Sequence, residues 1–177
     1  MRKETLFFYI LIISASVLAR LVPHAWNFAP ITAIAIASAI YLPKWQAIGL
    51  TVAIRLVSDI IIGFFSWPLM IAVYASHLSG VAIGLWVKKN KTILRIAVSP
   101  LASALIFFFV TNFAWFYPEY PHNILGIAQS YINGLPFLRG TLAGDAFYTF
   151  AIVGVMEGAI FLKRKHVLKE GSVGIIL

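Results

Sequence analysis

Six apolar runs, separated by short polar segments, constrain this chain more than any other feature of its sequence. A helix needs about 20 residues to cross the hydrocarbon core of a bilayer, and it must satisfy its own backbone groups there. Only 11% of the residues are charged, against about a quarter in soluble domains. We therefore expect an all-α integral membrane protein, a six-helix transmembrane bundle that forms one domain over residues 1–177. The expected spans are approximately 5–22, 30–43, 46–66, 68–87, 93–115 and 141–162.

The second apolar run, residues 30–43, is too short to cross a bilayer unaided. It can cross if a re-entrant stretch precedes it, if the bilayer thins, or if it ends buried in protein. Irregular backbone is tolerated at membrane depth only where it faces protein or a wet cavity. We expect PHAWNFAP (23–30) to fold down into the outer half of the bundle as a re-entrant-like first outer loop.

The basic residues are divided unevenly between the two sides of the expected bundle. Six crossings place both chain ends on one side, and eleven of the fourteen Lys and Arg residues fall on that side. The opposite loops hold only Arg139, while Arg20 and Arg55 lie within spans. Because cytoplasmic loops are enriched in Lys and Arg, we expect both termini in the cytoplasm and a multi-pass protein of the inner or plasma membrane. The net charge of +8 then reflects membrane topology and indicates no nucleic-acid partner.

An alternative concerns the first 19 residues, MRKETLFFYILIISASVLA. A basic start, an apolar core and small residues near the end resemble a cleavable secretory signal peptide. Arg20 and Pro23 are poor neighbours for a cleavage site, so an uncleaved first span is favoured. A mature amino terminus near Arg20 would refute the six-span arrangement.

Arg55 and Asp59 lie four residues apart near the centre of the third run. A helix places such a pair on one face. Each charge there costs roughly 2.5–3.5 kcal/mol on insertion scales, so charged residues in spans usually have a partner, a cavity or a function. Ion pairs among Arg20, Arg55, Asp59 and Asp145 are one interpretation, and they would serve the scaffold alone.

A solute site in the outer half of the bundle is the other interpretation. Polar and aromatic side chains from several spans and two loops are expected at similar depths there. A concave, largely apolar pocket with a few convergent polar groups is typical of small-molecule sites. The candidate solute-binding residues are Trp26, Asn27, Phe28, Asp59, Asn112, Trp115, Tyr131, Arg139 and Asp145.

Small residues recur at four-residue spacing in several of the expected spans. Such rows let membrane helices approach closely, and packing within the bundle is the ordinary explanation. Ala15 and Ala19 on the first span are instead the best candidates for docking another subunit. The other rows are Ala33/Ala37, Ala72/Ser76/Gly80/Gly84 and Gly154/Gly158.

The sequence provides no recognisable catalytic or metal-binding pattern. HExxH, GxSxG, P-loop and GxGxxG motifs are missing, and the chain has no cysteine. His24, His77 and His122 lack metal-ligand spacing. We therefore expect neither an enzyme nor a metal or cofactor site, and ATP-driven work would require another polypeptide.

Four segments resemble an uncharacterised family of small prokaryotic membrane proteins, domain-of-unknown-function family 6580, whose members are often labelled as transport proteins. The stretch ASAIYL (37–42) departs from the family pattern, because members often have two glycines and a phenylalanine there. The resemblance covers about residues 20–154. The segments are VPHAWNFAPITAIA (22–35), SDIIIGF (58–64), TNFAWFYPEYPHNILGIAQSYINGLPF (111–137) and GTLAGDAFYTFAIVG (140–154).

That family is in turn similar to the substrate-binding S-components of energy-coupling factor transporters. This similarity implies six helices, an outward-facing solute site, and a first-helix AxxxA pattern, matched by Ala15 and Ala19, that faces a transmembrane coupling subunit with its ATPases. We therefore expect a solute-binding subunit for uptake. A self-sufficient permease or channel and a non-transport scaffold or assembly protein are the alternatives.

Overall fold

The computed structural model describes residues 3–22 and 27–173, and over these residues the chain forms six α-helices, one 3-10 turn and no strand. The fold is therefore all-α, as the sequence predicts. The helices are α1 (Lys3–Leu21), α2 (Ile31–Tyr41), α3 (Lys44–Ile62), α4 (Trp67–Lys89), α5 (Ile93–Thr111) and α6 (Ile124–Val173), with the 3-10 turn η1 at Ala114–Phe116.

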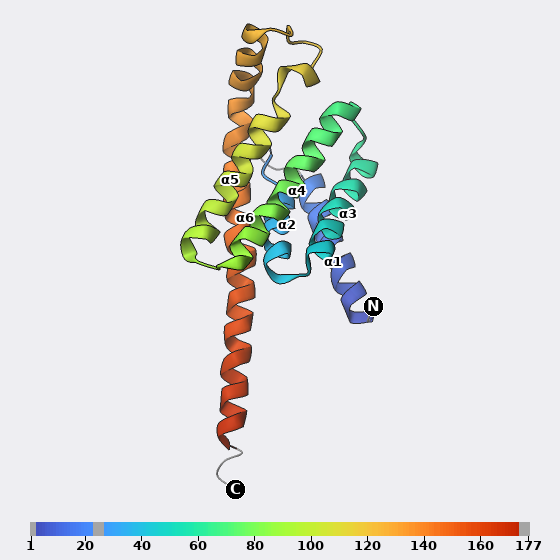
Figure 1. Ribbon diagram of the computed structural model, residues 1–177. Helices are drawn as coiled ribbons and strands as arrows, with labels where there is room; N and C mark the ends of the chain where they lie inside the picture. The colour runs from blue at the N-terminus through green and yellow to red at the C-terminus, as the bar shows by residue number, and fades with distance from the viewer. Residues whose placement is uncertain (1–2, 23–26, 174–177) are drawn as a thin grey trace.

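The helices form an elongated bundle with α2 at its centre (Figure 1). α2 packs against α3, α4, α5 and α6, whereas α1 packs mainly against α3 at the edge. α1 begins, and α6 ends, at the same end of the bundle as the α2–α3 and α4–α5 turns (Figure 1). The α3–α4 turn and the α5–α6 connection lie at the other end, which we call the outer end.

α2 has 11 residues, of which nine are buried. At 1.5 Å per residue it is only about 16 Å long, well short of the thickness of a bilayer core. Ile31, Ile36 and Ile40 are each at most 5% exposed, so neighbouring helices surround α2. Burial within the protein is thus how the fold accommodates the short second apolar run.

The small-residue row on α4 is the surface that packs against α2. A Cβ added at Gly84 would lie 2.7 Å from the Cβ of Ala39 and still closer to the carbonyl oxygen of Ile36. At Gly80 it would meet Ala35 at 3.2 Å. These two helices therefore approach closely because α4 has glycine at the contact. A Cβ at Gly154 or Gly158 on α6 would meet nothing within 4 Å.

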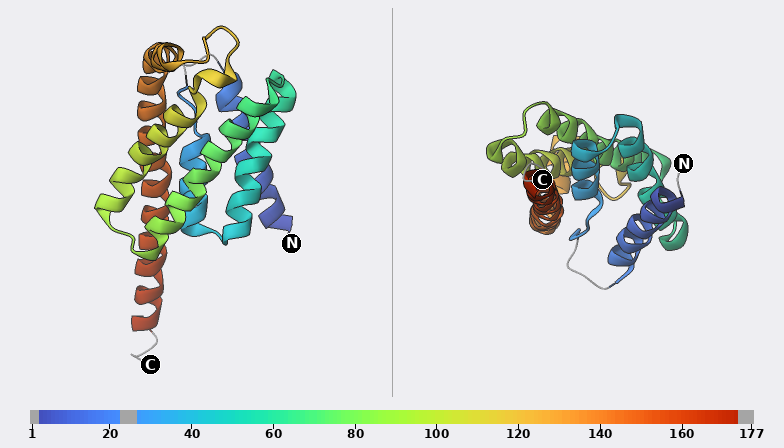
Figure 2. Two further views of the ribbon diagram at one scale, coloured as in Figure 1. Left: turned by 45° about the horizontal axis from the view of Figure 1, so that its top comes forward. Right: turned by 90° about the horizontal axis from the view of Figure 1, so that it is seen from below.

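The expected spans leave residues 116–140 as an outer loop; this expectation is wrong from Ile124 onward, whereas residues 141–162 are helical as expected. α6 begins at Ile124 and continues to Val173, a single helix of 50 residues. Only residues 112–123 connect α5 to it. The polar residues and Pro136 of this stretch suggested a loop, yet a membrane-protein helix tolerates proline where neighbours satisfy the freed carbonyl. The first part of α6 is turned relative to the remainder (Figure 2), and proline is a usual cause of such a bend.

Two other helices end earlier than expected at the outer end. α3 stops at Ile62, where Gly63 adopts φ 112°, a conformation that favours glycine. α5 stops at Thr111 and is followed by η1.

In the 23–30 segment, residues 23–26 lie outside the described residues. The next three residues are non-helical and lead into α2.

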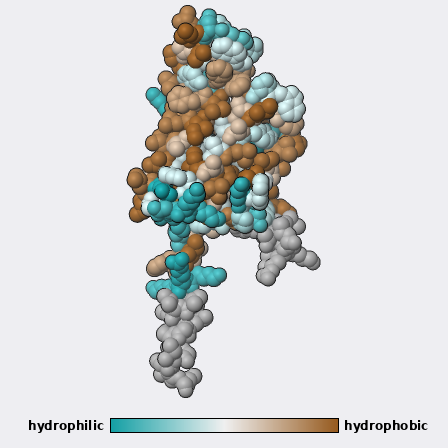
Figure 3. Space-filling view, viewed as in Figure 1, coloured by the Kyte–Doolittle hydropathy of each residue, from teal (hydrophilic) through white to brown (hydrophobic). Residues whose placement is uncertain are grey.

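Four helices, α3, α4, α5 and α6, are long and apolar enough to cross a membrane, while α2 and the described part of α1 are shorter apolar helices. Hydrophobic residues cover the middle of the visible face, and hydrophilic residues gather near the turns at the lower end of the bundle (Figure 3). Apolar side chains on the surface include Trp67 at 76% exposed and Ile71 at 67%. Such a surface belongs in lipid, and the chain is a membrane protein.

Candidate functional site

Asp59 on α3 is held by two arginines. Its Oδ2 accepts a hydrogen bond from Nε of Arg55, one turn earlier on the same helix, over 2.8 Å. Its Oδ1 accepts one from Nη1 of Arg20, near the end of α1, also over 2.8 Å. The hydroxyl of Tyr74 on α4 donates to Oδ2 over 3.0 Å. One carboxylate therefore joins three helices.

The arginine cluster, Arg20, Arg55 and Asp59, is buried at Asp59 and Arg55 and half-buried at Arg20, and it is not neutral. Asp59 is fully buried and Arg55 is 6% exposed, so water screens their interaction little. Two guanidinium groups share one carboxylate, which leaves one net positive charge. Asp145, the other candidate for pairing, has no arginine within ion-pair distance among the described residues.

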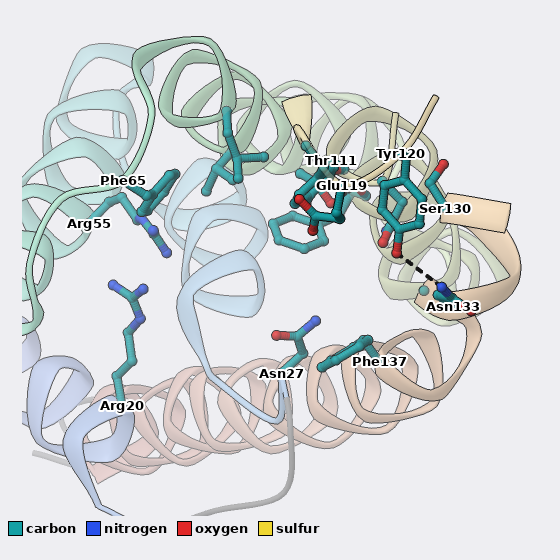
Figure 4. Close-up of a pocket in the computed structure, with 16 residues that line it drawn as sticks. Arg20, Asn27, Arg55, Phe65, Thr111, Glu119, Tyr120, Ser130, Asn133 and Phe137 are labelled. Carbon is teal, nitrogen blue, oxygen red and sulfur yellow. Dashed lines mark hydrogen bonds between the residues drawn. The ribbon is translucent and has the colours of Figure 1, made fainter. Parts of the chain in front are cut away.

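A cavity of about 490 Å³ opens beside the two arginines, toward the outer end of the bundle. Arg20 and Arg55 lie on one side of it, and Thr111, Glu119, Tyr120 and Asn133 lie on the other (Figure 4). The volume falls within the range of about 300–1,000 Å³ that is usual for small-molecule sites. The apolar part of the wall comes from Phe65, Leu69, Val73, Phe107 and Phe137.

A smaller cavity of about 190 Å³ shares Arg20, Asn27, Arg55 and Phe107 with the larger one. Its remaining wall includes Asp145, which is 2% exposed. The Oδ2 atom of Asp145 has no hydrogen-bond partner in the described part of the chain. The two cavities together form a hollow, with polar and apolar walls, that reaches from the outer end toward the centre of the bundle.

Thr32 of α2 and His77 of α4 also line the smaller cavity. Thr32 Oγ1 lies 3.1 Å from Nδ1 of His77, and the ring of His77 packs 5.2 Å from that of Phe107. His77 thus has a hydrogen-bond partner and a packing role, and it also faces the hollow.

Asn27 borders both cavities and has a left-handed backbone conformation, with φ 59°. Asparagine tolerates this region better than most residues other than glycine. The carbonyl oxygen of Asn27 accepts a hydrogen bond from the backbone N–H of Ala29 over 3.0 Å, which closes a tight turn. The backbone of Phe28 lies against Gly144, where an added Cβ would be 3.0 Å from the Phe28 Cα. The turn is therefore fixed to α6, and Figure 4 shows the Asn27 amide directed into the hollow.

A family defined from sequence matches almost the whole chain: the family of unknown function DUF6580 covers residues 1–168. The chain belongs to DUF6580. No curated protein and no solved structure matches it.

In this DUF6580 chain, only some of the candidate residues from the sequence line the hollow. Asn27, Asn112 and Asp145 line it, as do Arg20 and Arg55. Asp59 lies behind the arginines and lines neither cavity. Trp26 lies outside the described residues.

Four candidate residues point elsewhere. Phe28 packs on Phe147 and Tyr148 of α6, with ring centroids 5.8 and 5.3 Å apart. Trp115 is 45% exposed and stacks on Phe113 at 4.9 Å. The Tyr131 hydroxyl donates to the Phe109 carbonyl over 2.8 Å. Arg139 is exposed and lines neither cavity.

Sequence reasoning missed a polar face on the first half of α6. Ser130, Asn133, Gly134 and Phe137 recur at three- and four-residue intervals and line the larger cavity. The same face continues through Thr141 to Asp145 in the smaller cavity. This helical periodicity was the available signal, and it is obscured once the stretch is interpreted as a loop.

Tyr117 and Glu119, in the α5–α6 connection, also escaped the sequence analysis. The Tyr117 hydroxyl donates to the Thr111 carbonyl over 2.8 Å. Burial, together with nearby Glu119 and Tyr120, raises the pKa of the Tyr117 phenol, so it remains protonated and keeps donating. This hydrogen bond holds the connection over the outer end of α5.

The proposed docking residues lie at the edge of the bundle. Ala15 is exposed and Ala19 is half-buried, on a helix that packs mainly against α3. Leu11 and Leu18 nearby are 53% and 59% exposed. This face of α1 is open to lipid or to another protein.

Proposed function

We propose that this DUF6580 protein is a membrane-embedded subunit that binds a small solute from the outer side for uptake. The observation that carries the proposal is the hollow beside Arg20 and Arg55, because charges in a membrane bundle commonly mark a solute pathway. Ion pairing alone accounts for Asp59, but it leaves the second arginine's charge and the adjacent cavity of about 490 Å³ without a purpose.

The proposal includes six membrane crossings with both termini in the cytoplasm. Four helices meet the length needed to cross, and α2 could complete its crossing inside the protein. The exposed Lys88, Lys89 and Lys91 lie at the α4–α5 turn, at the end where α1 begins and α6 ends (Figure 1). Basic residues favour the cytoplasmic side, so the hollow would open to the exterior.

Uptake would need a partner under this proposal. The chain contains no nucleotide-binding motif, so a separate transmembrane subunit with ATPases would supply energy. The exposed Ala15 face of α1 is the proposed contact, since small residues allow close helix approach. Catalysis forms no part of the proposed function.

A thermal-shift screen of the purified protein against vitamins, nucleobases and their precursors tests solute binding. We expect at least one compound to stabilise the wild-type protein, and Asn133→Ala to weaken that effect because Asn133 lines the hollow. Asn90→Ala is the matched control, since Asn90 is exposed in the α4–α5 turn. This turn lies at the opposite end of the bundle from the α5–α6 connection (Figure 1). Absence of stabilisation by every compound would contradict the proposal.

Reconstitution distinguishes a binding subunit from a self-sufficient permease. The purified protein in liposomes should bind the solute found in the screen and produce no flux without a partner and ATP. Flux that depends on Arg55 under those conditions would establish the permease instead.

A further inference from the structure

The larger cavity has chemically different ends. Arg20 and Arg55 form what we call the arginine end, and Tyr117, Glu119 and Tyr120 form the acidic end. Figure 4 shows Arg20 and Arg55 on one side of the space and Glu119 and Tyr120 on the opposite side. Any solute that fills the cavity meets both environments.

Arg55 has unused donors at the arginine end. Only its Nε is engaged, with Asp59, and its two terminal nitrogens donate no hydrogen bond to any described residue. Its guanidinium group is buried and faces the cavity (Figure 4). A planar guanidinium offers paired N–H groups whose spacing matches a carboxylate.

The charge of the arginine cluster favours a carboxylate over a phosphate. Two arginines and one aspartate leave one positive charge, which one carboxylate neutralises. A phosphate monoester carries about −1.5 to −2 at neutral pH and would leave an excess negative charge in a buried place.

The acidic end suits an ammonium group. Glu119 is exposed, lines the cavity, and has no ion pair with any described basic residue. The rings of Tyr117 and Tyr120 lie edge to face, 6.0 Å apart. A carboxylate beside aromatic faces attracts cations through charge and the ring quadrupole.

From these two ends, and resting on the proposed function, we infer that the solute is an elongated amino carboxylate. Its carboxylate binds Arg55 and Arg20, and its ammonium group binds at Glu119 beside the two tyrosines. The aromatic and aliphatic wall of Phe65, Leu69 and Phe107 contacts the chain between the two charges.

Equilibrium binding to the full chain in lipid nanodiscs tests this inference. The probes are 4-aminobutanoate, 5-aminopentanoate and 6-aminohexanoate, which sample three separations of the charges. Butanoate, pentanoate and hexanoate remove the ammonium group, and butylamine, pentylamine and hexylamine remove the carboxylate. We expect at least one amino carboxylate to bind at least tenfold more tightly than either matched compound.

Two variants test which end of the cavity binds which charged group of the solute. Arg55→Lys keeps the positive charge beside Asp59 but loses the paired donors, and it should weaken amino-carboxylate binding about tenfold or more. Glu119→Gln should reduce the affinity to that of the matched carboxylate. A normal thermal unfolding temperature for each variant shows that it folds, and Lys91→Gln, at the opposite end of the bundle, should bind as the wild type does.

The outcomes separate this inference from the proposed function. Tighter binding of the amines than of the amino carboxylates, or unchanged affinity in folded Arg55→Lys and Glu119→Gln, would overturn the inference. A neutral or cationic compound from the vitamin and nucleobase screen that binds while all nine probes fail would overturn it and leave the proposed function intact. Failure of the probes and of the screen together would remove both.

Discussion

Arg55 donates a hydrogen bond from Nε to Oδ2 of Asp59 over 2.8 Å, one turn along α3. The pair is local in sequence, but Asp59 also accepts from Arg20 on α1 and from Tyr74 on α4, so the same carboxylate joins three helices. Its charge holds two guanidinium groups at the wall of the hollow. The scaffold and the site are therefore built from the same residues.

Replacement of Asp59 by Asn should destabilise the protein severely. The buried Arg55 and the half-buried Arg20 would lose their shared counter-charge, and loss of one partner of a buried ion pair costs roughly 3–5 kcal/mol. Thermal unfolding in detergent should show a large decrease in midpoint. Lys91→Ala is the control: it breaks the pair between Lys91 and Glu157, whose side chains are 36% and 40% exposed, and exposed pairs contribute at most about 1 kcal/mol. Equal stability of the two variants would contradict the assignment.

A methyl group at Gly84 should separate α4 from α2. Its Cβ would clash with the backbone of Ile36, which cannot move away without shifting the central helix, and overpacking typically costs about 1–3 kcal/mol. Gly84→Ala should therefore lower the unfolding midpoint. Gly49→Ala, where an added Cβ meets nothing within 4 Å, should be neutral or slightly stabilising. The reverse order would mean that these helices do not pack as described.

Asn27 allows the backbone of the first outer segment to be tested separately from its side chain. Asn27→Gly suits the φ of 59°, so it should keep the stability of the wild-type protein while it weakens solute binding through loss of the amide. Asn27→Val should reduce stability by roughly 1–2 kcal/mol, because left-handed backbone is costly for residues with a branched Cβ. The measurements are the unfolding midpoint and the solute affinity. Unchanged affinity in Asn27→Gly would exclude the amide from the site.

Single-cysteine labelling tests the proposed topology directly, because the chain has no native cysteine. Phe64→Cys and Pro118→Cys, in the α3–α4 turn and the α5–α6 connection, should react with a membrane-impermeant maleimide in intact cells. Lys3→Cys, Lys89→Cys and Lys163→Cys should react only after the cells are permeabilised. If Lys3→Cys were labelled from outside while Lys89→Cys and Lys163→Cys were not, α1 would not cross the membrane and the other proposed crossings would stand.

The features that the sequence predicted correctly are those that depend on the local spacing of residues. The four-residue interval between Arg55 and Asp59 places them on one helical face, and the row that ends at Gly84 follows the same rule. Arg20 could be assigned to the same depth from its place near the end of an apolar run. These features depend on one helix at a time.

Features that depend on tertiary packing were not predictable in this way. Phe28 and Trp115 are aromatic and near the expected site, but their rings pack on α6 and on Phe113. The helical start at Ile124 was hidden because Asn133 and Pro136 have low helix propensity, whereas contact with α5 stabilises a helix there. Asp145 could have paired with either arginine, and only the arrangement of α1, α3 and α6 shows that it pairs with neither.

The most direct test of the central claim, a sheltered and positively charged hollow open to the exterior, is modification of Val73→Cys in intact cells. Val73 lines the larger cavity and is only 7% exposed. An impermeant thiosulfonate should modify this cysteine from outside. Relative to the exposed Pro118→Cys, an anionic reagent should react faster with it than a cationic one, because the arginine cluster attracts anions. A cysteine at position 73 that resists both reagents from outside, or that prefers the cationic one, would contradict the account.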